Sequence, residues 1–276
     1  GLKVFLAKHG SAPFVSVGLH TRGGSETVTP ARFTDFAFRT FTAQEPGQIA
    51  GDWFGGELGD GQVFGIEAPS GNLHAALDLV YDRTTSTIST WDSRVFERVE
   101  DVEKRRLKTQ EKRPDIWASR ALWNLLIPGS ARGTPYDWKA IEKLGSSDYD
   151  KWWKQVLAPK NDTLFVVGDI DLVETEKLVT GMWSKWRLDN PGEPLPGYKP
   201  MNTLPSRQIA LVDDQDATQA NIQVGCHLKP KEIETDAAKD VLSAMLSQDL
   251  FVAIRKRAGA SYGVYAFDFA LGDTSL

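Results

Sequence analysis

The residues best suited to chemistry lie near the C-terminus, where a predicted helix rich in Ala, Leu and Val ends in a basic turn. Arg255 falls in the last helical turn, Gly259 suits the left-handed conformation that closes a helix, and Tyr262 opens the next predicted strand. A guanidinium and a phenol that converge on one spot can grip a peptide carbonyl and stabilise developing negative charge. Basic residues at a helix C-terminus also interact favourably with the helix dipole, so the spacing alone fits a structural role as well.

The four histidines, His9, His20, His74 and His227, are scattered singly along the chain. Hydrolytic zinc needs imidazoles and a carboxylate at helix-compatible spacing, and neither H-E-x-x-H nor H-x-x-E-H occurs. His9 and His20 lie on the first two predicted strands and could face each other, but no carboxylate supports them. We therefore predict no metal site in this chain.

Other catalytic patterns are also missing from the sequence. No serine has the G-x-S-x-G context of a nucleophile, and Cys226 has only the adjacent His227, which points to the opposite face of a strand. Cys226 is predicted to be an ordinary strand thiol. The Gly-rich residues 55–61 lack the Lys-Ser/Thr of a phosphate loop, and a mobile surface loop is predicted there.

Length and composition limit the class of protein. A chain of 276 residues exceeds what one core usually organises, which predicts two domains. A net charge of -5 with interspersed signs argues against nucleic acid, and no apolar run is long enough to span a membrane. The single cysteine excludes an internal disulfide and leaves the compartment open.

The first 190 residues predict an α+β domain. Residues 2–21 alternate as two strands that form a hairpin or near-hairpin, and 62–68 and 162–168 form further strands. Predicted helices follow Asn72 and cover 92–113, the stretch from Trp117 to Leu126, 147–157 and 171–187. The helix after Asn72 carries its apolar residues on one face, and 92–113 is highly charged.

A Pro-rich segment at 191–204 is the best domain boundary, because four prolines within 189–200 favour an extended backbone. Beyond it the pattern restarts, with strands at 207–213, 218–228 and 261–270 and a helix over about 231–257. We predict an α+β chain of two-layer domains, each with a mixed, mostly antiparallel sheet packed against helices. Residues 1–190 are predicted to form the first domain, and 205–276 the N-terminal part of a second domain. A start on Gly1 favours a processed or excised piece.

These segments resemble the insulinase/pitrilysin metallopeptidases. Ile254, Arg255, Gly259 and Tyr262 match the family's L-R-x-x-x-G-x-x-Y passage. Further matches, in the family's order, are the opening strands, the passage Tyr149 to Asp169, and the stretch Asp213 to Ile222 at the start of the next domain.

One departure from the family decides what the resemblance implies. Near the family's H-x-x-E-H position the chain reads Thr34-Asp35-Phe36-Ala37-Phe38, without either imidazole or the catalytic Glu. On the helix where the family might supply a further carboxylate ligand, Glu97, Glu100 and Glu103 are interpreted as solvated charges. The resemblance thus implies the half that lacks metal, with no cofactor of its own.

The resemblance further implies a chamber of two halves, in one chain or as a heterodimer, with zinc in a homologous partner half. Arg255 and Tyr262 would reach that zinc centre and bind the backbone of a peptide substrate, which adds to an exposed strand edge nearby. The bacterial periplasm and the cytoplasm are the expected compartments. The alternative functions are a proteolytically inactive structural or assembly subunit and a peptide-binding module that acts alone.

Overall fold

The computed structural model describes residues 1–10, 12–26, 49–57, 61–86, 93–184, 186, 206–215, 218–228, 233–271 and 274–275. The sequence predictions for Thr34 to Phe38 and for the segment 191–204 lie outside these residues. The elements in chain order are β1 (Lys3–Lys8), β2 (Phe14–Arg22), β3 (Asp52–Glu57), β4 (Gly61–Pro69), η1 (Ser70–Asn72), α2 (Leu73–Thr85), α3 (Ser93–Gln110), α4 (Pro114–Leu126), η3 (Ala131–Gly133), α5 (Trp138–Ile141), α6 (Ser146–Val156), β5 (Asp162–Gly168), α7 (Leu172–Trp183), α8 (Ile233–Leu250), η4 (Phe251–Arg257), β6 (Ala270–Leu271) and β7 (Thr274–Ser275).

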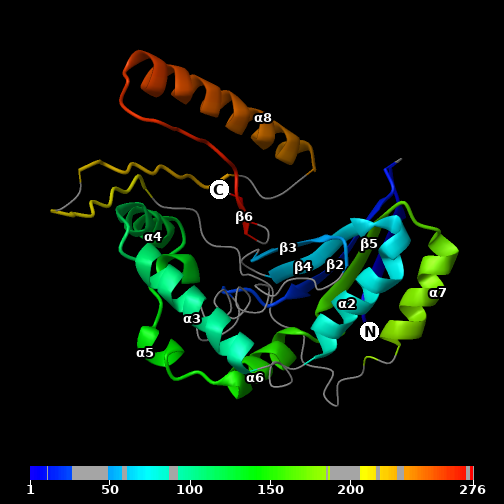
Figure 1. Ribbon diagram of the computed structural model, residues 1–276. Coiled ribbons are helices and arrows are strands. Elements are labelled where there is room, and N and C mark those ends of the chain that lie inside the picture. Colours follow the sequence, from blue (N-terminus) through cyan, green and yellow to red (C-terminus); the bar gives the residue numbers. More distant parts are fainter. Residues whose placement is uncertain are drawn as a thin grey trace.

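A five-stranded mixed sheet forms the centre of the first part of the chain, in the order β1-β5-β2-β4-β3 (Figure 1). β1 runs parallel to β5, and the other neighbours are antiparallel. The predicted hairpin of the first two strands is therefore wrong, because β5 lies between them and pairs with both. It follows that His9 and His20 do not face each other across a strand pair. The α+β fold class predicted from the sequence is confirmed.

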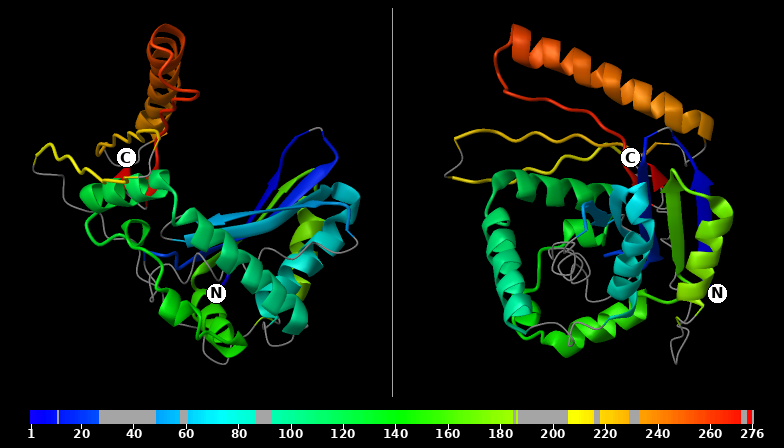
Figure 2. Two further views of the ribbon diagram at one scale, coloured as in Figure 1. Left: turned by 60° about the vertical axis from the view of Figure 1, so that its left-hand side comes forward. Right: turned by 45° about the vertical axis from the view of Figure 1, so that its right-hand side comes forward.

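One face of this sheet is covered by helices. Strand positions alternate, so every second residue of β2, β4 and β5 points to this face and is buried. The buried apolar residues are Val15, Val17, Leu19, Phe64, Ile66, Ala68, Leu164 and Val166. Helix α2 packs on β2 and β4, and α7 packs on β1 (Figure 2). The predicted apolar face of α2 is confirmed, since Ala76, Leu77 and Val80 are buried.

Aromatic rings join the helices to this face. The ring of Phe64 lies 5.7 Å from that of Trp153 on α6, and Tyr81 on α2 meets Trp183 on α7 edge-on at 5.3 Å. Such pairs add to the area that each large side chain buries. The helices α2, α6 and α7 are therefore fixed to one layer, against which the rest of the chain is placed.

On the opposite face of the sheet, the ring of Phe54 on the edge strand β3 packs over two glycines. Gly18 and Gly65 are neighbours in the β2–β4 register, and Phe54 of β3 pairs with Gly65. The Phe54 ring lies over both, so a Cβ at Gly18 would come within 3.0 Å of a ring carbon. Gly55, Gly56 and Gly61 lie in strands β3 and β4, which corrects the predicted Gly-rich loop for those residues.

The segments around α8 lie beyond α4, on the side away from α5 and α6 (Figures 1 and 2). The predicted strands 207–213 and 218–228 are extended, yet their described residues join no ladder apart from a single bridge at Leu228. A strand forms only where a partner aligns with it, and sequence alternation does not supply the partner. Apolar residues of these segments are consequently exposed, among them Leu211 (93%) and Val224 (90%).

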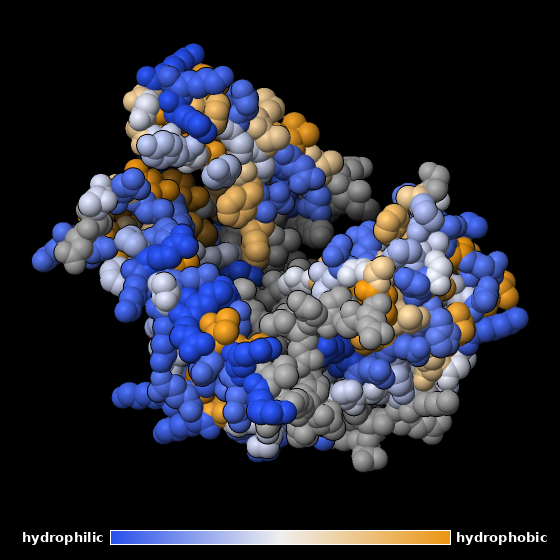
Figure 3. All heavy atoms as spheres, in the orientation of Figure 1, coloured by the Kyte–Doolittle hydropathy of each residue, from blue (hydrophilic) through white to orange (hydrophobic). Residues whose placement is uncertain are grey.

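The helix α8 and its continuation confirm the predicted helix over about 231–257, although the described part begins at Ile233. Apolar side chains at Val241, Leu242, Met245 and Leu246 are exposed on it, and Figure 3 shows apolar side chains among hydrophilic ones on its surface. No described helix combines the length and apolar character needed to span a bilayer.

Asp162 gives the fold a testable dependence on pH. It opens β5 opposite Thr21 and is 1% exposed. Burial raises the pKa of its carboxyl well above the usual value. Neither carboxyl oxygen has a hydrogen-bond partner among the described residues, and the nearby Thr21 hydroxyl donates to the Val156 carbonyl at 2.7 Å. A raised folded-state pKa stabilises the fold below the unfolded-state value, and this contribution is lost as pH rises through the folded-state value.

We therefore expect Asp162→Asn to be more stable than the wild type at high pH, with an advantage that shrinks as pH falls. The difference should change by up to about 1.4 kcal/mol per pH unit within the window that begins near pH 4. Thermal unfolding of both proteins across pH measures it. Asp52→Asn, at an exposed aspartate of β3, is the control and should follow the wild type. A difference between Asp162→Asn and the wild type that does not vary with pH would contradict the prediction.

Candidate functional site

The predicted Arg255–Tyr262 segment begins in a widened helical turn. The last seven residues of the helix, η4, are π-helical, and the Ala258 N–H donates to the Ala253 carbonyl at 3.2 Å. Gly259 has φ +62°, which confirms the predicted left-handed closure, and the Ala260 N–H then donates to the Ile254 carbonyl at 3.0 Å. π-helical turns are rare and often lie at functional sites.

The two predicted site residues lie on either side of this closure, and both are exposed. The Arg255 guanidinium lies 5.1 Å above the ring centroid of Phe251, and Tyr262 is 88% exposed. The hydrogen bonds beside Tyr262 join Ser261 to Gly263, and among the described residues none joins Arg255 to Tyr262. The turn therefore presents a forked cation and a phenol to the surroundings without pairing them to each other. A role for the pair in binding substrate stays a prediction.

The extended segment that follows Tyr262 is tied back to the helix. Ser247 of α8 donates its hydroxyl to the Ala266 carbonyl at 3.0 Å and accepts the Ala266 N–H at 2.9 Å. Three residues further on, Phe269 meets Trp123 of α4 edge-on, with ring centroids 5.2 Å apart. Helix, turn and extended segment thus form one arm that is attached to α4.

A second extended segment attaches the start of this arm to α4. The His227 Nε2 lies 2.8 Å from the Leu126 carbonyl, and the Gln223 side-chain amide donates to the Asp115 carbonyl at 3.2 Å. A Cβ on Gly225 would meet the side chain of Leu126 at 2.7 Å, so the backbone runs close to the helix. The predicted strand thiol Cys226 is exposed in this segment.

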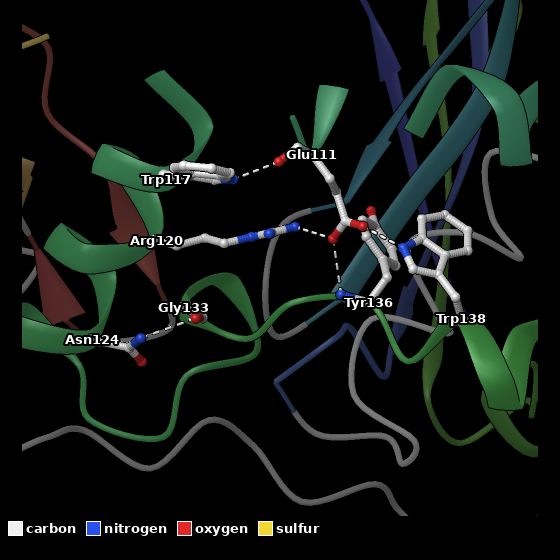
Figure 4. A network of polar contacts seen from close by, with 7 residues as sticks. All are labelled: Glu111, Trp117, Arg120, Asn124, Gly133, Tyr136 and Trp138. Carbon is white, nitrogen blue, oxygen red and sulfur yellow. Dashed lines mark hydrogen bonds and ion pairs between the residues drawn. The ribbon is translucent and has the colours of Figure 1, made fainter. Parts of the chain in front are cut away.

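The carboxylate of Glu111 holds α4 in place (Figure 4). It accepts hydrogen bonds from the Arg120 guanidinium, from the Tyr136 backbone N–H at 3.0 Å and from the Trp138 indole N–H. The Glu111 carbonyl also accepts the Trp117 indole N–H at 2.5 Å. The side chains of Glu111 and Arg120 are only 15% and 13% exposed, which shields the ion pair from solvent.

The loop after α4 is also attached to the sheet. Glu26, which follows β2, accepts the Ser130 hydroxyl at 2.6 Å and the Ala131 N–H at 3.0 Å. The Asn124 side-chain amide donates to the Gly133 carbonyl at 2.9 Å. These contacts connect the end of β2 through η3 to α4, and so to the arm.

Two of the three glutamates interpreted as solvated are not, and this corrects the sequence prediction. Glu100 is 9% exposed and accepts the hydroxyl of the buried Tyr149 at 2.9 Å. Glu103 makes a two-pronged contact with Arg106, with distances of 2.6 and 3.0 Å. Only Glu97 is exposed as predicted. The sequence did not reveal this burial, because charged residues occur on every side of the helix and the sequence does not show which side packs inward.

The other candidate residues have ordinary surroundings. His74 pairs with Asp78 at 2.9 Å on the exposed side of α2. Within the described part of the chain, no three His, Cys, Asp or Glu side chains gather as a metal site would require. The sequence prediction missed Glu111 and Phe269 as organising residues. The one available signal was the concentration of Trp and Arg after residue 111.

Comparisons with known proteins agree with this fold. Residues 145–276 match the family described as "Peptidase M16 inactive domain". A peptidase M16 inactive domain from Pseudomonas fluorescens is similar in structure over 96% of this chain and 68% of its own, with a TM-score of 0.69 at 16% identity. A protease from Helicobacter pylori gives a TM-score of 0.75 at 17% identity, over 100% of this chain and 71% of its own.

A chain of complex III2 from Candida albicans is more distantly similar, with a TM-score of 0.54 at 16% identity. That match covers 72% of this chain and 47% of the other. No curated protein matches the chain by sequence. The match of residues 145–276 and the similar structures support the resemblance to the inactive half of the insulinase family.

The Glu111 network leads to a prediction for stability. Glu111→Gln removes the charge but keeps the shape, which leaves Arg120 without its anion in a largely buried place. We expect a loss of about 2 kcal/mol in the free energy of unfolding, as for a charge-assisted hydrogen bond. Chemical denaturation followed by tryptophan fluorescence measures it. The matched control is Glu142→Gln, whose pair with Lys108 is exposed and should contribute little. Equal effects of the two substitutions would contradict the role given to Glu111.

Proposed function

We propose that this chain is the half of an M16 peptidase that binds no metal, and that it holds peptide substrate at the active site of a zinc-bearing partner half. The observation that carries the proposal is the exposed π-helical turn, which presents Arg255 and Tyr262 on either side of Gly259. In this proposal residues 1–190 and 205–276 are two domains joined by 191–204.

The chemistry assigned to this chain is binding and charge stabilisation. The guanidinium of Arg255 offers several N–H donors in a fixed fork, and the phenol of Tyr262 offers one O–H donor. Both suit the carbonyl of a peptide bond and the oxyanion that forms when it is attacked. A charged hydrogen bond made in the transition state stabilises it by roughly 1.5–3 kcal/mol, enough to change turnover strongly.

Zinc would supply the activated water, and it would belong to the partner. The donor sets described in this chain do not fit a zinc ion, since no cluster of suitable side chains exists among the described residues. The peptide would reach the pair as an extended strand added to an exposed strand edge near the partner's centre.

The second candidate is a structural or assembly subunit without proteolysis. The similarity to a chain of complex III2 from Candida albicans favours it. The two functions differ in whether Tyr262 contributes to turnover, because a structural subunit has no need of an exposed phenol beside a forked cation.

Substitution of Tyr262 tests the proposal. In the complex reconstituted with its native partner, Tyr262→Phe should lower kcat roughly tenfold or more, as the loss of one transition-state hydrogen bond implies, and leave assembly intact. Peptide cleavage and size-exclusion chromatography measure the two properties. Tyr265→Phe is the matched control, since Tyr265 lies three residues further on and is 80% exposed. Unchanged cleavage by Tyr262→Phe would favour the structural candidate.

Metal content tests whether zinc is bound by the partner half and not by this chain. We expect one zinc per complex and none bound stoichiometrically by the isolated chain, because the described donors do not cluster. Purification with the native partner followed by elemental analysis measures both. Stoichiometric zinc on the isolated chain would overturn the assignment of the metal to the partner.

A further inference from the structure

The arm that carries Arg255 and Tyr262 meets the first part of the chain at one cationic contact. The Arg132 guanidinium lies 4.6 Å from the ring centroid of Phe269 and 5.2 Å from that of Trp123. Trp123 and Phe269 also contact each other edge-on. Leu126 and Ile127, 4% and 1% exposed, form the apolar base on which both rings pack. A desolvated cation between rings binds more strongly than an exposed one.

Arg132 itself is held firmly in place. Its backbone N–H donates to the Ser130 hydroxyl at 3.1 Å, and that hydroxyl donates to Glu26. The next residue, Gly133, accepts from Asn124 of α4. A Cβ on Gly133 would collide with the Asn124 side-chain amide, so this close approach requires glycine. The backbone that carries Arg132 is thus attached to the end of β2 and to α4 by contacts that do not involve the arm.

The contact between Arg132 and Phe269 is close enough to Tyr262 in the sequence to restrict the position of the π-helical turn. Phe269 follows Tyr262 by seven residues, an extended reach of roughly 23 Å. Halfway along, the Ser247–Ala266 hydrogen bonds transmit the position of the segment to α8. By contrast, Tyr262 makes no hydrogen bond to the described residues of the first part of the chain, and its side chain is 88% exposed. Its position is therefore set through Phe269.

We propose that Arg132 is the positioning residue of the site, and that its clamp on Phe269 fixes the arm bearing Arg255 and Tyr262 against the first domain. The inference rests on the proposed function for its catalytic consequence, but not for its structural one. Arg132 touches no substrate. It acts by limiting the orientations in which the exposed pair can face a partner half.

The structural test measures a distance in the chain alone. Spin labels are placed at Lys151→Cys on α6 and Gln248→Cys on α8, both exposed, in a Cys226→Ser background. Electron–electron double resonance should give one narrow distance distribution for this protein. In Arg132→Met the population outside that peak should rise roughly tenfold, as expected when a partly buried cation–π contact to two rings is lost. Arg132→Lys, which keeps the charge but not the planar group, should lie in between.

Two further variants separate positioning from folding. Phe269→Leu changes the arm only and should broaden the distribution as Arg132→Met does. Arg105→Met, at an arginine that is 71% exposed, should change nothing. An unchanged distribution in both Arg132→Met and Phe269→Leu would overturn the proposal. Loss of the unfolding transition of the first domain in Phe269→Leu would overturn it too, since the contact would then be part of the core.

The catalytic test uses the reconstituted complex. Arg132→Met should lower kcat with little change in KM, and it should have a smaller effect when Tyr262 is already Phe, because both substitutions act on one interaction. Full additivity of the two would contradict the coupling. If Tyr262→Phe alone has no effect, the proposed function fails, while the distance measurement still decides the role of Arg132.

Discussion

The carboxylate of Glu111 is the point on which the outer part of this structure depends. It accepts donors from Arg120 on α4, from the backbone at Tyr136 and from Trp138 on α5. Tyr136 and Trp138 belong to the core that covers the sheet, whereas Arg120 lies on α4. A charged acceptor that is shielded from water binds such donors more strongly than a neutral one would, and it is costly to leave unpaired. The orientation of α4 is set in this way.

Two segments that lie beyond α4 contact that helix. The segment 218–228 contacts α4 through Gln223, Gly225 and His227, and Phe269 contacts it through Trp123. Between these two attachments run α8 and the π-helical turn. The arm has its own internal hydrogen bonds at Ser247 but exposes apolar side chains that a stable domain would bury. Its orientation therefore relies on α4 and on Arg132 rather than on a core of its own.

Much of the local structure was predictable from the sequence, because it depends on neighbours in the chain. The alternation of 162–168 and the apolar stripe of α2 are satisfied within a few residues, and Gly259 closes its helix as its lack of a Cβ allows. The order of strands was not predictable, since alternation says which residues share a face and not which strand lies alongside. Glu100 and Glu111 looked like two more charges on a charged stretch, and only tertiary packing distinguishes them.

The residues of the candidate site were predictable from the sequence, but the turn and the contacts that position them were not. Arg255 and Tyr262 stand out by type and spacing, whereas the π-helical turn between Phe251 and Arg257 arises from residues that suit an ordinary α-helix equally well. Arg132, Trp123 and Phe269 come from three distant parts of the sequence, and no spacing rule brings them together. An exposed pair cannot position itself, because water competes for each donor and the side chains lose entropy when they are fixed. Precision in such a site has to come from the backbone that carries it, and here the backbone is fixed at a contact seven residues from the phenol.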